Sequence, residues 1–158
     1  MIASAGGHVE TVKYLLEHGS SVSAINDLNG NTSLSYAAMN GFHESCNYLL
    51  LKGAQVDIEN KLLQTPLMLA AKNGHTATVT FLLSRGALIN HHDINGSTPL
   101  YLAVTGGHLS TIKILISKGA SKNIKTIEGY TPLTYAEKYQ LKECISILNE
   151  QTESKRPR

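Results

Sequence analysis

The chain has 158 residues, of which 42% are hydrophobic, and a formal net charge of +2, which allows one domain with a buried core. So small a net charge gives no strong field, and neither nucleic acid nor an anionic membrane is indicated as a partner. Cys46 and Cys144 each lack a second cysteine nearby, which excludes a disulfide framework and a paired-cysteine zinc site.

A reducing, intracellular setting fits this cysteine usage. No apolar run reaches the ~20 residues that a membrane helix needs. The first residues, MIASAGGHVE, contain neither the basic nor the apolar region of a secretory signal. We therefore expect a protein without membrane association in the cytoplasm, with the nucleus left open.

In chain order, the sequence repeats one kind of unit. Residues 8–18 read HVETVKYLLEH, and similar segments follow at 42–52, 75–85 and 108–118. A threonine recurs every 33 residues, at Thr32, Thr65, Thr98 and Thr131. The segment between Gly19 and Thr32 is one residue longer than the corresponding segments of later units. The extra residue falls near Ile25 and Asn26, where a loop can absorb it. Such a period is typical of a stacked solenoid, whose units cannot bury their apolar faces alone.

The unit that begins at Thr65 illustrates the local chemistry. The Thr65 hydroxyl can cap a helix, and Pro66 fits its first position because the amide hydrogen there has no helical partner. The first helix contains Leu67, Leu69, Ala70 and Ala71 and ends at Gly74. A second helix has an apolar stripe of Val79, Leu82 and Leu83 and ends at Gly86. The segment ALINHHDING then predicts a hairpin that turns at Asn95 and Gly96.

These residues resemble the ankyrin repeat family, whose Thr-Pro-Leu pattern and 33-residue period are a known signature. The resemblance covers nearly the whole chain and implies an all-α solenoid of helix-turn-helix units with β-hairpin loops. We expect about four full repeats plus an N-terminal half repeat in a single domain, residues 1–150. The unit bounds are approximately 1–24, 27–58, 60–91, 93–125 and 126–150, followed by a disordered tail at 151–158.

The chain departs from the family pattern at several positions. The histidine that usually follows Thr-Pro-Leu is replaced by Ser35, Met68, Tyr101 and Thr134. Ser33 stands in place of proline, and Gln140-Leu141 in place of Gly-His. At the other end, the sequence opens inside a first helix and leaves an apolar face exposed, so we expect the parent protein to continue before Met1.

Catalytic motifs are absent from the sequence, which contains no GxxxxGK[ST], GxGxxG or HExxH stretch. His8, His75 and His108 occupy one repeat position and are interpreted as structural. His91 and His92 adjoin in an expected hairpin strand, so their rings should point to opposite faces and not chelate one metal ion. Cys46 and Cys144 are expected in the core. We predict no catalytic activity, no cofactor and no metal.

The resemblance implies a concave partner-binding surface made by hairpin tips and first helices. The expected partner is a protein or peptide, bound by a monomer. The hairpin candidates are Leu28, Asn29, Asn31, Lys61, Leu62, Gln64, Ile94, Asn95, Ser97, Ile127, Glu128 and Tyr130. The first-helix candidates are Met39, Lys72, Asn73, Tyr101, Thr105, Lys138 and Tyr139.

The aliphatic residues at the tips have two interpretations. They either pack against the neighbouring hairpin and stiffen the row, or present an apolar ladder that anchors a partner. Lys61, Lys72 and Lys138 outnumber Glu128 among the candidates and favour a partner with some acidic character. Asn90 follows Ile89 and lies eight residues after Leu82, which resembles the hairpins that asparaginyl hydroxylases modify. Alternatively, Asn90 bonds the turn backbone.

Two other functions stay open at this stage. The segment could be the targeting or substrate-recruiting arm of a larger enzyme or effector. It could also be a structural assembly or chaperone-like subunit. Fold alone does not decide among them, because repeat scaffolds serve many functions.

Overall fold

The chain folds into a row of short helices, which the computed structural model describes for residues 1–150. The first helices of successive units are α1 (Ile2–Ala5), α3 (Ser33–Met39), α5 (Pro66–Lys72), α7 (Pro99–Thr105) and α9 (Pro132–Lys138). The second helices are α2 (Val9–Glu17), α4 (His43–Leu51), α6 (Thr76–Ser84), α8 (Leu109–Ser117) and α10 (Lys142–Asn149). The predicted disordered tail, residues 151–158, lies outside the described residues.

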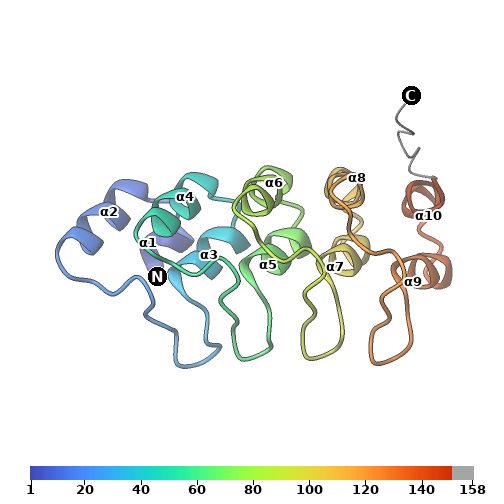
Figure 1. The fold of residues 1–158 in the computed structure, drawn as a ribbon, viewed down its shortest axis with the longest axis horizontal. Coiled ribbons are helices and arrows are strands. Elements are labelled where there is room, and N and C mark those ends of the chain that lie inside the picture. The colour runs from blue at the N-terminus through green and yellow to red at the C-terminus, as the bar shows by residue number, and fades with distance from the viewer. Residues whose placement is uncertain (151–158) are drawn as a thin grey trace.

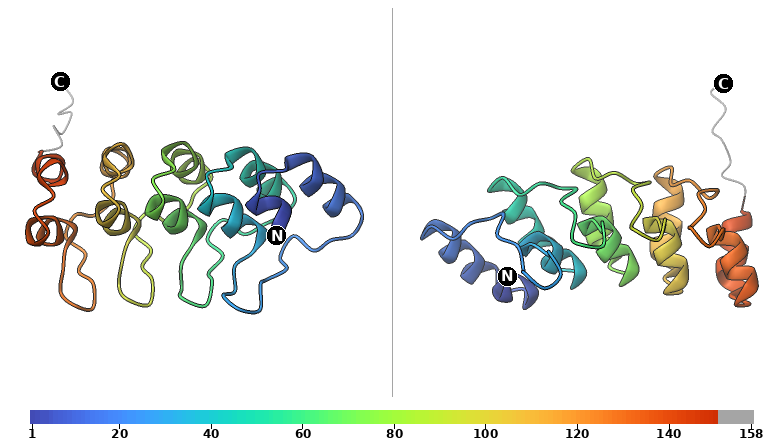
Figure 2. Two further views of the ribbon diagram at one scale, coloured as in Figure 1. Left: turned by 180° about the vertical axis from the view of Figure 1, so that it is seen from behind. Right: turned by 90° about the horizontal axis from the view of Figure 1, so that it is seen from below.

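The helices stack in two parallel layers. Each first helix packs against the first helix of the next unit, and the second helices form a row of their own, above the first helices in Figure 1. Figures 1 and 2 show the loops between units projecting side by side from one edge of the stack. The all-α solenoid predicted from the sequence is confirmed. None of the helices in the described part is long and apolar enough to cross a membrane.

The loops between units have the shape of hairpins without the ladder of a sheet. Within residues 1–150 no strand forms, and an isolated antiparallel bridge joins Ile25 to Thr32. The first loop closes between Asn26 and Asn31 and is one residue longer than the others, such as the loop from Asn60 to Gln64. The extra residue therefore lies next to the place predicted for it.

Threonine caps start the first helices of four units, as predicted. The Thr65 hydroxyl oxygen accepts a hydrogen bond from the Met68 amide at 3.4 Å, and Thr98 does the same for Tyr101 at 3.2 Å. In the first and last of these four units the bond is reciprocal, because the hydroxyls of Ser35 and Thr134 accept from the amides of Thr32 and Thr131. Two of the departures from the family pattern thus complete a capping box.

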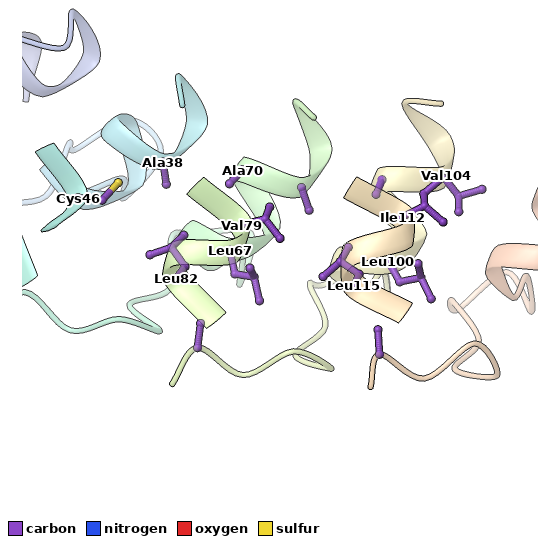
Figure 3. Packing of buried hydrophobic residues seen from close by; sticks show 14 of the residues in the cluster. Ala38, Cys46, Leu67, Ala70, Val79, Leu82, Leu100, Val104, Ile112 and Leu115 are labelled. Carbon is purple, nitrogen blue, oxygen red and sulfur yellow. The ribbon is translucent and has the colours of Figure 1, made fainter. Parts of the chain in front are cut away.

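The core is a continuous apolar layer between the two rows of helices. Equivalent positions recur from unit to unit: Cys46, Val79 and Ile112 on the second helices are fully buried (Figure 3). Cys144 is also buried, so both cysteines lie in the core as expected. Desolvation by burial raises the pKa of the Cys46 thiol to about 12. A thiol of this kind packs as a small apolar group and is inert as a nucleophile.

The recurring histidines join neighbouring units. The ring nitrogen Nε2 of His75 lies 2.9 Å from the carbonyl oxygen of Met39, the last residue of α3. His108 makes the same bond to the carbonyl oxygen of Lys72 at the end of α5. The last carbonyl groups of a helix have no partner within the helix. The two histidines supply that partner from the next unit, which is the structural role expected of them.

Candidate partner-binding surface

Each hairpin loop is closed by backbone and side-chain hydrogen bonds at its neck. In the loop from Asp93 to Ser97, the Asp93 amide donates to the Ser97 carbonyl at 3.0 Å. The Asp93 carboxylate in turn accepts from the amides of Asn95 and Ser97, both at 2.9 Å. Asn60 does the same in the preceding unit, where its side-chain oxygen accepts from the amides of Leu62 and Gln64 at 2.9 Å. Short polar side chains favour such turns because they bond to nearby backbone amides.

Neighbouring tips are also bonded to each other through the backbone. The Lys61 amide donates to the Asn29 carbonyl at 3.0 Å, and the Ile94 amide to the Leu62 carbonyl at 3.1 Å. A third bond, 2.9 Å long, runs from the Ile127 amide to the Asn95 carbonyl. The four tips therefore form one continuous edge, and backbone atoms hold neighbouring tips together.

Four aliphatic residues point outward from this edge, and we call them the tip row. Their relative exposures are 88% for Leu28, 51% for Leu62, 56% for Ile94 and 76% for Ile127. More than half of each residue is in contact with solvent, although burying such side chains would be favourable by about 1.5–3 kcal/mol each. Backbone hydrogen bonds thus join the tips while at least half of each aliphatic residue stays exposed.

Four of the predicted surface positions are buried instead. They are Asn31, Gln64, Ser97 and Tyr101, each 9% exposed or less. Asn31 accepts a hydrogen bond from the Asn60 side chain at 2.9 Å, and Gln64 lies 3.3 Å from the same amide. Asn31, Gln64 and Ser97 directly precede the cap threonines, and Tyr101 lies in the first turn of α7. They are therefore part of the buried scaffold.

The remaining predicted positions lie on or beside the exposed edge. Exposed residues are Asn29, Lys61, Lys72, Asn73, Asn95, Glu128, Lys138 and Tyr139, while Met39, Thr105 and Tyr130 are partly buried. Two of the three lysines are engaged within the chain: the Lys61 ammonium donates to the Asp27 carbonyl, and the Lys138 ammonium to the Tyr130 hydroxyl. The Tyr130 bond raises the pKa of Lys138.

An aromatic cluster gathers at the C-terminal end of the surface. Tyr135 lies at its centre, with ring centroids 4.5 Å from Tyr139, 5.2 Å from Tyr101 and 6.4 Å from Tyr130. Desolvation, followed by the proximity of Tyr135, raises the pKa of Tyr101. Sequence reasoning missed Tyr135. The signal available was its repeat position, which also holds Tyr36, Leu69 and Leu102.

Asn90, the residue considered for hydroxylation, links two units. Its side-chain oxygen accepts a 2.8 Å hydrogen bond from the Ser121 amide. Asp57, at the equivalent position one unit earlier, accepts from the Leu88 amide at 3.0 Å. Asn90 therefore bonds backbone, as in the alternative interpretation, but the backbone belongs to the next unit. The residue itself is exposed.

The adjacent histidines are arranged differently from the prediction. The rings of His91 and His92 are stacked, with centroids 6.0 Å apart and an interplanar angle of 25°. The expected opposite orientation is wrong, because these residues lie in a loop where the alternation of a strand does not apply. His91 Nε2 lies 3.1 Å from the Glu59 carboxylate of the preceding hairpin. From Met1 to Glu150, no group of three or more potential ligands could hold a metal ion.

Comparison with known proteins identifies similar repeats. A family model described as ankyrin repeats in three copies matches residues 1–60, 48–126 and 67–156. Ankyrin repeat domain-containing protein 17 of Mus musculus is 42% identical over 67 residues, which are 42% of this chain. Ankyrin repeat and KH domain-containing protein 1 of Homo sapiens shows the same identity over the same length. The matched segment is 3% of the length of each relative.

Proposed function

Because the chain belongs to the ankyrin repeat family, whose repeats are generally protein–protein interaction modules, we propose that it binds a protein or peptide through the hairpin tips and the adjoining first helices. The observation that carries the proposal is the tip row. Leu28, Leu62, Ile94 and Ile127 are large, aliphatic and exposed on a rigid edge. Apolar anchors surrounded by polar groups are where interface energy concentrates.

The composition around the tip row supports this use. Asn29 and Asn95 flank the aliphatic residues with polar side chains that are exposed, and Glu128 does so in the last unit. Such a rim suits an interface that forms and dissociates in water. Because packed helices lie ~8–10 Å apart, four tips span enough length for a contact on the order of 800 Å² per partner.

A rigid edge also lowers the cost of binding. The tips are held by the backbone bonds at Asn29, Leu62 and Asn95, so little conformational freedom remains to be lost when a partner docks. Preorganisation of this kind increases affinity without adding contacts. The Tyr135 cluster offers a second anchor at one end, where Tyr139 is 53% exposed.

A non-catalytic role agrees with the family match, which covers ankyrin repeats, typically a non-catalytic domain. Since the matched relatives are far longer than this chain, the module fits equally well as the recognition arm of a larger protein. In that setting the binding surface of this chain is unchanged, and the tip row still selects the partner.

The test is affinity capture from a lysate of the source cell with three forms of the chain. One form is the wild type, and the second carries Leu28→Ser, Ile94→Ser and Ile127→Ser. The matched control carries Leu51→Ser and Leu88→Ser, which remove exposed leucines outside the tip row. Equal helicity by circular dichroism establishes that all three are folded.

We expect a specific protein to be captured by the wild type and the control and lost from the tip-row variant. The captured protein, once purified, should bind the wild type with an affinity at least tenfold higher than its affinity for the tip-row variant. Capture of the same proteins by all three forms would show that the tips are structural and would remove the basis of the proposal.

Hydroxylation of Asn90 is proposed separately, for a host that has an asparaginyl hydroxylase. The exposure of Asn90 supports access by an enzyme, although its oxygen must first leave the Ser121 amide. Mass spectrometry of the protein from its own cells would show a gain of one oxygen on this residue. An unmodified peptide from cells that contain the enzyme would contradict the proposal.

A further inference from the structure

Four asparagines in the chain are followed directly by glycine, and the structure places them in two settings. Asn40 and Asn73 directly follow α3 and α5, at the ends of those helices. Asn29 and Asn95 lie at hairpin tips, beside the tip row. All four are exposed. An asparagine before glycine is open to deamidation, because glycine has no side chain to obstruct attack by its own amide nitrogen on the asparagine side chain.

At the helix ends, hydrogen bonds hold the asparagine side chains in place. The side-chain amide of Asn40 donates to the carbonyl oxygen of Tyr36 at 2.9 Å. The side-chain amide of Asn73 donates in the same way to the carbonyl oxygen of Leu69 at 2.8 Å. Each of these side chains is therefore turned back toward its helix, and away from the amide nitrogen of the glycine that follows it.

At the tips, the two asparagines differ from each other. The Asn29 side chain donates to the Tyr36 hydroxyl at 3.1 Å, and its oxygen accepts from the Asn31 amide at 2.9 Å. The Asn95 residue uses its backbone amide to bond the Asp93 carboxylate, but within residues 1–150 its side chain forms no hydrogen bond. Of the four side chains, that of Asn95 is thus the least restrained.

Gly96 is required by the shape of this tip. Its φ angle is +74°, a conformation that glycine adopts without strain. A Cβ atom at this position would lie 3.1 Å from the Ile127 amide nitrogen and from the Cα atom of Thr126. The Gly96 amide donates to the Asp93 carbonyl at 2.8 Å and must leave that bond before it can react. Local opening of this kind costs least in exposed loops.

We propose that Asn95 is a site of spontaneous deamidation, which converts a neutral tip of the binding surface into a carboxylate. The Gly96 amide nitrogen, after losing its proton to water, attacks the side-chain carbonyl carbon of Asn95. A C–N bond forms, the bond to the side-chain nitrogen breaks, and ammonia leaves after taking a proton from water. A water molecule then opens the succinimide at either carbonyl group and gives aspartate or isoaspartate. The net reaction consumes one water molecule and releases one ammonium ion.

The aspartate product changes the charge of the tip row and leaves its fold intact. Glu128 stands at the equivalent position one unit later and is exposed, so the fold accepts a carboxylate there. The new charge lies directly beside Ile94, which is 56% exposed. Its effect on a bound partner rests on the proposed function, whereas the deamidation reaction itself does not.

The isoaspartate product also changes the backbone. In this product the main chain runs through the former side chain of Asn95. The carbonyl group that accepts a 2.9 Å hydrogen bond from the Ile127 amide becomes part of a free carboxylate. This product therefore alters one of the backbone bonds that join neighbouring tips, in addition to adding a charge.

The test incubates the purified full chain at neutral pH in water enriched in heavy oxygen. A carboxylate formed during the incubation carries the label, which separates it from deamidation during later handling. Peptide mass spectrometry then gives the rate at each asparagine, and the same chain unfolded in urea gives the reference rates. Asn29, Asn40 and Asn73 are controls within the same molecule. The matched variant is Asn95→Gln, which keeps an amide but forms the cyclic intermediate far more slowly.

We expect Asn95 to react first in the folded chain, at a rate within about tenfold of its rate in the unfolded chain. Asn40 and Asn73 should be slowed more than about a hundredfold by folding. A more acidic form of the protein should accumulate with time on an anion-exchange column. In the Asn95→Gln variant this form should be nearly absent, although the helicity of the two proteins is equal.

Two results would overturn the proposal. One is protection of Asn95 in the folded chain as strong as that of Asn40 and Asn73. The other is reaction at one of the three control asparagines ahead of Asn95. The capture experiment on the tip row uses freshly prepared protein and does not depend on either result, so the two proposals can fail separately.

Discussion

The side-chain amide of Asn60 donates a 2.9 Å hydrogen bond to the side-chain oxygen of Asn31, and so joins two neighbouring hairpins inside the protein. Both residues are buried. Asn60 also accepts from the amides of Leu62 and Gln64. One side chain thus fixes the shape of its own loop and the contact with the loop before it.

Replacing Asn60 should therefore be costly. Asn60→Ala leaves two buried or partly buried amides without partners and should lower the free energy of unfolding by about 2–3 kcal/mol. Asn60→Asp keeps the accepting oxygen, as Asp93 does one unit later, but loses the amide that donates to Asn31, so it should cost about 1–2 kcal/mol and less than Asn60→Ala. Urea unfolding measures both. Equal losses for the two variants would mean that the accepting oxygen is unimportant.

Gln140 offers a stabilising substitution. Its φ angle is +55°, and the four equivalent positions are the glycines Gly7, Gly41, Gly74 and Gly107, all with positive φ. A residue with a Cβ atom pays about 1–2 kcal/mol in this region, and the added freedom of glycine in the unfolded chain offsets part of that. Gln140→Gly should thus raise the free energy of unfolding by about 0.5–1 kcal/mol. Gln140→Ala, which keeps the Cβ atom, is the control and should bring no gain.

The contribution of the hydrogen bond between His75 and Met39 to stability can be measured with a substitution that keeps a ring of similar size. Phe42 takes the place of His75 one unit earlier and packs against Gly7, as His75 packs against Gly41. His75→Phe should keep this packing, lose the 2.9 Å bond and lower the free energy of unfolding by about 1 kcal/mol. His75→Ala should cost more, because the ring contact also disappears. A neutral His75→Phe would show that the hydrogen bond contributes nothing.

The raised pKa of the Cys46 thiol predicts a loss of stability at alkaline pH. In the folded protein its pKa is raised from 9.0 to about 12, so the thiol stays protonated where the unfolded chain has already ionised. The unfolded state then binds fewer protons, and the free energy of unfolding falls as pH rises from about 9 to about 12.

The matched control is Cys46→Val, because Val79 occupies the same position one unit later. The difference in stability between wild type and variant should widen in favour of the variant across this pH range. Thiol alkylation at pH 8 should modify Cys46 at the rate of unfolding. Rapid alkylation of the folded protein would contradict the burial argument.

Local chemistry made most of the fold predictable. A threonine cap, a proline in the first turn and a glycine at the helix end depend on neighbours within a few residues, and their 33-residue recurrence fixed the stack. The place of Leu28 and Ile127 at the tips was predicted, but the sequence alone left open whether these side chains are exposed or packed against the neighbouring hairpin.

Other features depend on contacts between units and were not predictable. The burial of Asn31 requires Asn60, which lies 29 residues away. The cluster around Tyr135 combines residues of α7, α9 and the loop between units. His91 and His92 were assigned a strand geometry that a loop without a ladder does not impose. In the first two cases the deciding neighbour comes from another unit.

The bonds between tips use backbone atoms at Asn29, Leu62 and Asn95. The positions of the tips therefore do not depend on the side chains that a partner would recognise. A substitution of Leu28, Ile94 or Ile127 changes what the edge presents without changing the spacing at which it is presented. Each tip can therefore diverge by single mutations while its neighbours keep their positions. An edge built in this way can acquire a new partner gradually, one residue at a time, without passing through an unfolded intermediate in its evolution.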